Sequence, residues 1–153
     1  MSLEPAFVHG GRRSKVPARL KQWRGLSGED ALVWERFLQT YDTSRMKVEY
    51  NVRLGSPAQN IIEDNPALAE MWTELRQKRV DAVVEWEEEI WIVELKPRGS
   101  LSALGQALAY KLLYEEQEKP TKPVEPVVIC AWLDDDLRRV MGELGVNVFE
   151  VGT

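Results

Sequence analysis

Three residues in the middle of the chain are of types that could act together on a substrate. Asp81 is followed, after twelve intervening residues, by Glu94 and then by Lys96 two positions later. Two carboxylates a few ångströms apart repel each other, which raises the pKa of one of them unless a cation lies between them. Mg²⁺ or Mn²⁺ suits such a pair, because hard cations prefer oxygen ligands. A neighbouring lysine can orient or deprotonate a water molecule, or stabilise charge on a phosphate, so the three groups together could hydrolyse a phosphodiester bond.

Two strands of a hairpin, residues 80–86 and 90–96, are predicted to carry these side chains. Side chains alternate between the faces of a strand, so Glu94 and Lys96 share a face. A two-residue loop would set Asp81 opposite Glu94, and a four-residue loop would set it opposite Lys96; either places all three on one face. A three-residue loop would turn Asp81 to the other face unless a bulge corrected it. The sequence therefore allows the cluster without requiring it.

A simpler interpretation is that Glu94 and Lys96 form an ion pair facing solvent. The preceding run, Ile90-Trp-Ile-Val93, is apolar on both faces, which is typical of an interior strand. Charges at the end of an interior strand are costly unless they are paired or bound to a metal. They also lie at the carboxyl end of a strand, where sheet folds place their sites.

The remaining elements are predicted from hydrophobic periodicity and from capping residues. Helices are expected near residues 28–41, 66–78, 101–118 and 134–144, and strands at 47–54, 127–133 and 146–151 in addition to the hairpin. Lys119 to Pro126 is expected to be a loop. The order α-β-α-β-β-α-β-α-β predicts an α/β fold with a mixed central sheet flanked by helices on both faces.

Charge divides the chain into two parts. The 153 residues carry a net charge of −5 and are 44% hydrophobic, which indicates one folded domain and excludes a protein that is basic overall. Residues 1–24 hold six Lys and Arg against one Glu, a net charge of +5. We therefore expect a basic N-terminal arm at 1–24 and a single domain at 25–153. The arm suits contact with a polyanion, and a solvated tail is the alternative.

The rarer residue types exclude several kinds of site. One cysteine, Cys130, excludes an internal disulfide and a cysteine-based zinc site, and one histidine, His9, makes a histidine-based triad improbable. No apolar run is long enough for a membrane helix and the start lacks a signal peptide, so a cytoplasmic location with no membrane partner is expected. Five tryptophans on element patterns are expected in the core: Trp34, Trp72, Trp86, Trp91 and Trp132.

Two stretches together resemble a known family. Arg79-Val-Asp81 with Ile92-Val-Glu94-Leu-Lys96, and Leu104-Gly-Gln106-Ala-Leu-Ala-Tyr110 on the next helix, resemble the PD-(D/E)XK nuclease superfamily, which includes restriction endonucleases and RecB-type nuclease domains. The closing strand–helix–strand looks like the RecB-like subgroup. The resemblance covers roughly residues 28–151, and it departs from the family name in having Val80 where the motif has proline. It implies a restriction-endonuclease-like fold and a Mg²⁺-dependent deoxyribonuclease.

The resemblance also implies roles for individual residues. Asp81 and Glu94 would be metal ligands for Mg²⁺, with Mn²⁺ as a substitute, and the carbonyl of Leu95 would be a third ligand. Lys96 would be the catalytic lysine. Gln106 would lie near the site, with Tyr110 one turn further on the same helix face.

An acid on the first helix joins the site in many members of the superfamily. Glu29, Asp30 and Glu35 are the candidates here. Helical phase sets Asp30 nearest the apolar stripe and Glu35 furthest from it, which favours Asp30, although Asp30 could equally be only a capping residue.

Partners follow from the same resemblance. DNA is the expected substrate, RNA is not excluded, and a homodimer is allowed. Four basic residues are expected to bind nucleic acid: Arg12, Arg13, Arg98 and Lys111. The alternative function is a catalytically silent nuclease-fold module that binds nucleic acid or a partner protein in a larger assembly.

Overall fold

The computed structural model describes residues 26–55 and 78–152. The described elements, in chain order, are α1 (Gly28–Thr40), β1 (Lys47–Leu54), β2 (Lys78–Glu85), β3 (Ile90–Arg98), α4 (Leu101–Glu118), β4 (Val124–Trp132), α5 (Asp135–Glu143) and β5 (Asn147–Glu150). The five strands form one sheet in the order β1-β2-β3-β4-β5. Strand β2 is antiparallel to both of its neighbours, whereas β3, β4 and β5 are mutually parallel.

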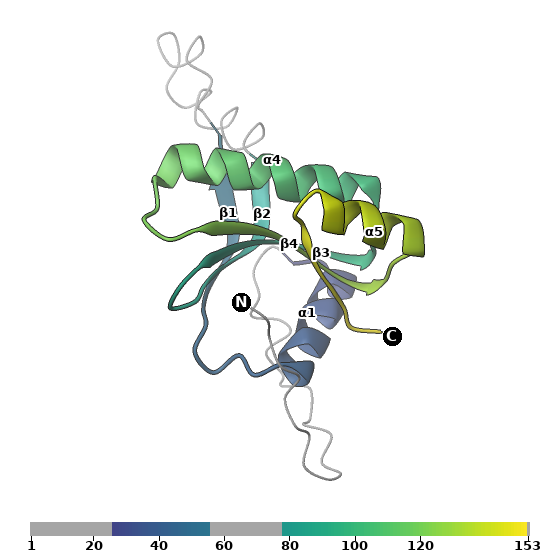
Figure 1. Ribbon diagram of the computed structural model, residues 1–153. Helices are drawn as coiled ribbons and strands as arrows, with labels where there is room; N and C mark the ends of the chain where they lie inside the picture. Colours follow the sequence, from purple (N-terminus) through teal and green to yellow (C-terminus); the bar gives the residue numbers. More distant parts are fainter. Residues whose placement is uncertain (1–25, 56–77, 153) are drawn as a thin grey trace, which may run out of the picture.

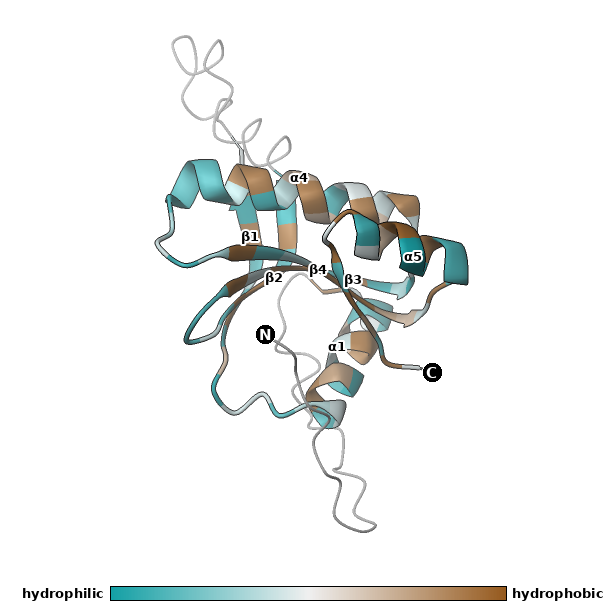
Figure 2. Ribbon diagram, in the orientation of Figure 1, coloured by the Kyte–Doolittle hydropathy of each residue, from teal (hydrophilic) through white to brown (hydrophobic). Residues whose placement is uncertain are grey.

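Helices cover both faces of this sheet (Figure 1). Helix α1 packs on one face through Val33, Trp34 and Phe37. Helices α4 and α5 lie together on the opposite face, where Ala107 and Met141 are fully buried. Strands β3 and β4 lie between these layers, and their brown colour in Figure 2 reflects apolar side chains on both faces. The predicted α/β fold with a mixed sheet flanked by helices is thereby confirmed.

Two predicted segments lie outside the described residues: the helix at 66–78 and the basic arm at 1–24. Among the described elements, the strand at 47–54 and the helix at 101–118 have the predicted bounds. No helix within residues 26–55 and 78–152 is long and apolar enough to cross a lipid bilayer.

Strand β4 corrects the predicted loop at 119–126. It begins at Val124 and includes Pro126, which lies level with Ile92 of β3. Pairing with β5 starts one residue later, at Val127 opposite Asn147. Pro126 therefore has a strand on one side only, and a proline that lacks an N–H is tolerated at such an edge position.

Strand β1 corrects the expectation of simple alternation. Val48 and Tyr50 pack with the core on the α1 side, whereas Val52 and Leu54 pack with the core on the α4 side. Asn51 lies between the two pairs with a φ of 54°, in the left-handed region that asparagine tolerates. The turn of the backbone at Asn51 changes the direction of the side chains, so the apolar residues before it pack on one face of the sheet and those after it pack on the other.

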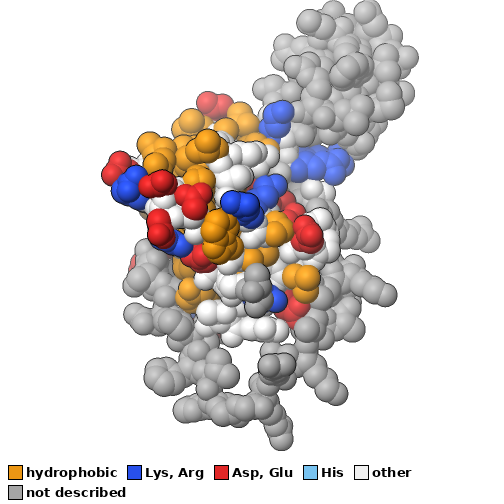
Figure 3. Space-filling view, turned by 90° about the vertical axis from the view of Figure 1, so that its right-hand side faces the viewer, with side chains coloured by type: hydrophobic (Ala, Val, Ile, Leu, Met, Phe, Trp, Pro, Cys, Tyr) orange, Lys and Arg blue, Asp and Glu red, His pale blue; other side chains and the backbone are white. Residues whose placement is uncertain are grey.

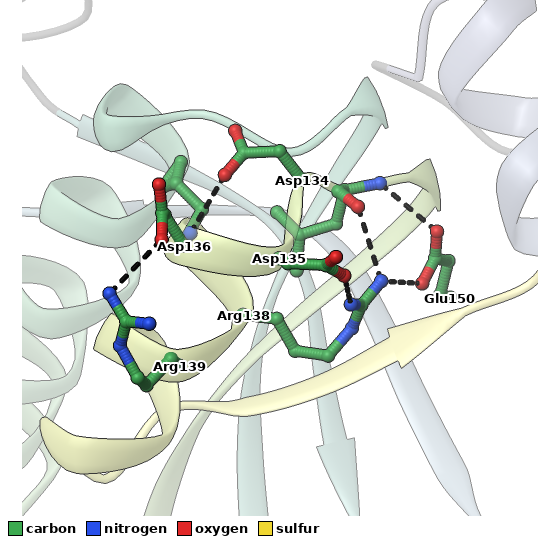
Figure 4. Close-up of polar contacts among 8 residues, drawn as sticks. Asp134, Asp135, Asp136, Arg138, Arg139 and Glu150 are labelled. Carbon is green, nitrogen blue, oxygen red and sulfur yellow. Dashed lines mark hydrogen bonds and ion pairs between the residues drawn. The ribbon is translucent and has the colours of Figure 1, made fainter.

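At the other edge of the sheet, Arg138 ties the carboxyl ends of β4 and β5 to α5 (Figure 4). Its guanidinium donates to Asp135 at 2.5 Å, to the carbonyl of Leu133 at 3.1 Å and to Glu150. The other carboxylate oxygen of Glu150 accepts the Leu133 N–H at 3.1 Å. Every charge in this group therefore has a partner, and the group fixes the edge at which parallel strands end.

Candidate active site

The hairpin between β2 and β3 sets Asp81 level with Glu94. The Trp86 N–H donates to the Glu89 carbonyl at 2.9 Å, so the chain reverses through a two-residue loop at 87–88. Of the loop lengths compatible with the sequence, this is the one that puts the two carboxyls opposite each other on one face.

Asp81 lies where β2 and β3 stop pairing. The last regular pair of the two strands is Ala82 with Val93, next to Asp81 and Glu94, and the Asp81 carboxylate accepts the Leu95 N–H at 2.8 Å. A side-chain oxygen thus takes the place of a backbone carbonyl as the acceptor for β3. Burial raises the pKa of the Asp81 carboxyl, with a further increase from the charge of Asp30, while the bond from Leu95 and the charge of Lys96 oppose the rise.

Glu94 is a buried carboxyl without a full set of partners. It is 2% exposed, and its Oε1 atom is buried with no hydrogen-bond partner among the described residues. Burial, and then the charge of Asp81, raise the pKa of Glu94 to about 9, while the charge of Lys96 lowers it. Without a cation, Glu94 therefore holds a proton at neutral pH.

Helix α4 adds two polar side chains from above the sheet. Ser100 caps the helix by accepting the Ala103 N–H at 3.1 Å, which starts the helix beside the end of β3. Gln106 and Tyr110 are one turn apart on the same helix face. The Oε1 atom of Gln106 is buried and has no partner. Burial raises the pKa of the Tyr110 hydroxyl, and the charge of Glu94 adds to the rise, so the phenol and the carboxyl share one environment.

Helix α1 reaches the same place with its first turn. Asp30 is one of the charges that raise the pKa of Asp81, which makes it the helix-one acid that the structure brings toward the pair. Its backbone N–H donates to the capping Ser27 at 3.2 Å, so its carboxylate is not needed for the cap. Glu29 is exposed on the same turn.

Glu35 differs from its predicted position. It was expected furthest from the apolar stripe of α1, yet it is 4% exposed, and burial raises its pKa. The buried residues of α1 cover about 200° of its circumference at 100° per residue, so a two-sided division of the helix fails. Its acceptor contact is with Gln39, at 3.4 Å, and Glu35 is not among the charges that influence Asp81 or Glu94.

The donors at this cluster fit a hard cation. Within the described residues, no three His, Cys, Asp or Glu side chains gather closely enough to hold a metal by themselves. The cluster instead offers two carboxylates and the amide oxygen of Gln106, and two of these oxygens are buried without a hydrogen-bond partner. All of the donors are oxygens, which is the set that Mg²⁺ and Mn²⁺ take.

The other predicted residues fall in different places. Leu95 is fully buried on the α1 side, and Lys96 is half-buried on the same face of β3 as Glu94. Arg98 is exposed at the end of β3. Lys111 pairs with Glu115 at 3.6 Å along α4 and is not among the charges that influence the two carboxyls. Arg12 and Arg13 lie outside the described residues.

A hollow of about 440 Å³ lies apart from this cluster, between β1 and the second half of α4. Its lining includes Val52, Val83 and Tyr114, with Glu49 and Glu118 at its rim. It has room for a ligand, but it contains none of the unpartnered oxygens, and the lysine of the cluster is not among its lining residues. The candidate site residues Asp81, Glu94 and Lys96 therefore lie outside this hollow.

Comparisons of the chain with protein-family models, with curated proteins and with solved structures found no match.

Proposed function

We propose that this protein is a metal-dependent nuclease that hydrolyses phosphodiester bonds in DNA, built on a restriction-endonuclease-like fold. One observation carries the proposal: the half-buried carboxyl of Asp81 lies opposite the buried carboxyl of Glu94, whose Oε1 atom has no hydrogen-bond partner, and Lys96 projects from the same face of β3 as Glu94. Burying the Glu94 carboxyl beside a second acid is unfavourable for folding, so the arrangement is best explained by a ligand that needs both carboxyls.

Mg²⁺ would be held by Asp81 and Glu94, with Gln106 as a neighbouring oxygen donor. When bound, the ion supplies Lewis-acid stabilisation of the charge that develops on the phosphate. Glu94, which holds a proton at neutral pH, would release it in order to serve as a ligand. Mn²⁺ is the natural substitute because it accepts the same oxygen ligands.

Lys96 acts on the water and on the phosphate. Its ammonium group can orient the attacking water, or neutralise the phosphate oxygens as negative charge builds on them. In the reaction the water oxygen forms a bond to phosphorus, the bond between phosphorus and the leaving oxygen breaks, and a proton from the water ends on that leaving oxygen. Tyr110 and Gln106 close the α4 side of the site, where they limit the access of bulk water.

A cleavage assay tests the proposal. The substrates are end-labelled linear duplex, single strand, flap and four-way junction DNA, with the matching RNA strand as a further arm. Each is incubated with Mg²⁺, Mn²⁺ or EDTA. We expect cleavage with either metal, none with EDTA, and a loss of about 10²- to 10⁴-fold in Lys96→Ala.

Lys122→Ala is the matched control, because Lys122 pairs with Glu85 at the opposite end of the hairpin and lies outside the site. It should cleave at the wild-type rate. No cleavage of any substrate by the folded, metal-loaded protein would overturn the nuclease proposal in favour of a silent binding module. Cleavage that survives Lys96→Ala would show that the active site lies elsewhere.

A further inference from the structure

Arg98 and Trp132 form an exposed pair at the carboxyl ends of β3 and β4. The two residues lie level in the parallel register, and the Arg98 guanidinium lies over the indole at 4.5 Å from the ring centroid. Trp132 is 47% exposed, whereas Trp34, Trp86 and Trp91 are at most 5% exposed. The prediction that Trp132 packs in the core is therefore wrong. We call Arg98 and Trp132 the stacking pair.

The backbone beneath the stacking pair is tightly fixed. The Gly99 N–H donates to the Trp132 carbonyl at 2.8 Å, which joins the two strand ends. A Cβ added to Gly99 would lie 2.3 Å from Leu133 Cδ1, so any larger residue here would require the Leu133 side chain to move. The pair is thus held on a rigid edge and not on a loop, which lowers the entropy lost when a ligand binds.

Packing does not account for the exposure of these side chains. A tryptophan buries a large area when it is part of a core, and here nearly half of it faces water. Arg98 forms no ion pair with the described part of the chain, in contrast to Arg138 and Arg139 on α5. A flat aromatic face and a flat guanidinium, both open to solvent, are the groups on which nucleobases stack.

The position of the stacking pair relates it to the candidate active site. Glu94, Lys96 and Arg98 project in succession from one face of β3, and at about 3.3 Å per residue Arg98 begins about 13 Å from Glu94. A strand whose phosphate meets Lys96 would therefore bring a nearby base to Trp132. Figure 3 views the molecule from this side and shows Lys and Arg side chains exposed beside hydrophobic ones.

We propose that Arg98 and Trp132 bind an unstacked nucleobase next to the site of cleavage. The proposal rests on the proposed nuclease function for the identity of the ligand. Bases inside a duplex are already stacked and their faces are covered, so the stacking pair selects a strand that is single, frayed or terminal at this point. The substrate class is therefore nucleic acid with an unpaired segment, in preference to continuous duplex.

Equilibrium binding tests this directly and needs no turnover. The full chain, in EDTA, is titrated into three fluorescein-labelled ligands while anisotropy is recorded: a single-stranded oligothymidylate, an abasic strand of the same length, and a duplex. Trp132→Ala should weaken binding of the oligothymidylate about 5- to 100-fold. It should change binding of the abasic strand and of the duplex less than about twofold, because phosphate contacts remain.

Conservative variants separate stacking from folding. Trp132→Phe keeps an aromatic face and should retain most of the affinity, whereas Arg98→Lys keeps the charge without the flat guanidinium and should lose part of it. Leu112→Ala, which removes an exposed apolar side chain from the middle of α4, and Arg139→Ala, which removes an exposed arginine from α5, are the matched controls. Both should bind like the wild type.

Any of three results would overturn the proposal that Arg98 and Trp132 bind a nucleobase. These are no measurable binding of the oligothymidylate by the wild type, no weaker binding in Trp132→Ala, or equally weaker binding of all three ligands in Trp132→Ala. These outcomes are distinct from failure of the nuclease proposal. If the protein cleaves nothing but shows base-dependent binding that is lost in Trp132→Ala, the base-stacking proposal stands and the nuclease proposal is rejected. If cleavage is lost in Lys96→Ala but binding is unchanged in Trp132→Ala, the nuclease proposal stands and the base-stacking proposal is rejected.

Discussion

Acidic and basic side chains gather in two places at the carboxyl edge of this sheet, and the molecule treats them in opposite ways. Around Arg138, the carboxylates of Asp135 and Glu150 lie at the surface and each has a cationic partner (Figure 4). Around Glu94, a buried carboxyl with one unpartnered oxygen lies opposite the half-buried carboxyl of Asp81. Both clusters contain an aspartate, a glutamate and one cationic side chain, but they differ in burial and in pairing.

Under the proposed function, this difference separates charges that stabilise the fold from charges that bind a metal ion. A paired surface cluster contributes modestly to stability, and each of its charges already has an ion-pair partner. A buried pair of like charges weakens the fold, raises the pKa of its members and leaves oxygens free for a cation. We therefore expect substitutions in the two clusters to have opposite effects on stability, and only one of them to affect catalysis.

The largest expected effect is the loss of cleavage at the buried cluster. Asp81→Asn keeps the size of the side chain and removes the charge that a metal ion requires. We expect the rate of DNA cleavage to fall by about 10²- to 10⁴-fold, as for Lys96→Ala. Asp135→Asn, in the surface cluster, should cleave at the wild-type rate in the same gel assay. A comparable loss in both variants would mean that the clusters do not differ in function.

The second effect is a gain in stability when Glu94 is neutralised. Keeping a proton on this carboxyl at neutral pH, with a pKa of about 9 in the folded protein, opposes folding by about 3 kcal/mol relative to an ordinary glutamate. Without metal, Glu94→Gln should therefore raise the free energy of unfolding in urea by about that amount, while it abolishes cleavage. Glu143→Gln, at the exposed end of α5, should change neither quantity. A destabilised Glu94→Gln would argue that this side chain serves the fold.

The third effect is a dependence of stability on pH. The folded protein keeps a proton on Glu94 that the unfolded chain releases near its ordinary pKa of 4.5. Stability should therefore be greatest at acidic pH and fall as the pH rises toward about 9, by at most about 1.4 kcal/mol per pH unit. Urea melts at a series of pH values measure the slope, and Glu94→Gln should flatten it. A wild-type profile that rises over this range would contradict the assignment.

The smallest expected effect lies in the surface cluster. Arg138→Ala removes the ion pairs to Asp135 and Glu150 and the bond to the Leu133 carbonyl. Because the guanidinium is partly exposed, the loss should be about 1 kcal/mol in the free energy of unfolding. The rate of cleavage should stay within about twofold of the wild type. A large loss of activity would show that this edge also positions the buried cluster.

Much of the fold could be predicted because the local signals agree with the tertiary structure. The alternating pattern at 47–54 and the capping serine before 101–118 predicted the bounds of a strand and of a helix correctly. The apolar run before Glu94 indicated that β3 is an interior strand. The shared face of Glu94 and Lys96 follows from the two-residue period of a strand. Agreement between pattern, caps and turns is what allows such predictions to succeed.

The failures have physical reasons as well. The loop length between β2 and β3 was open because it depends on one backbone bond, from Trp86 to Glu89. Trp132 could not be told from a core residue, because an apolar run looks the same before and after its strand leaves the core. Glu35 was predicted to lie furthest from the apolar stripe of α1, and this was wrong because the buried residues of α1 extend around more than half of the helix circumference. Helical phase favoured Asp30 among the acids of α1, and only the three-dimensional arrangement shows that its charge raises the pKa of Asp81.

The most direct test of the central claim is a calorimetric titration of Mg²⁺ or Mn²⁺ into the metal-free protein near neutral pH. Running it in two buffers with different ionisation enthalpies counts the protons released. We predict saturable binding with about one proton released per ion bound, because the ion displaces the proton held by Glu94. Binding should be lost in Glu94→Gln and in Asp81→Asn and kept in Asp135→Asn. Binding that persists in both buried variants, or binding without proton release, would contradict the account.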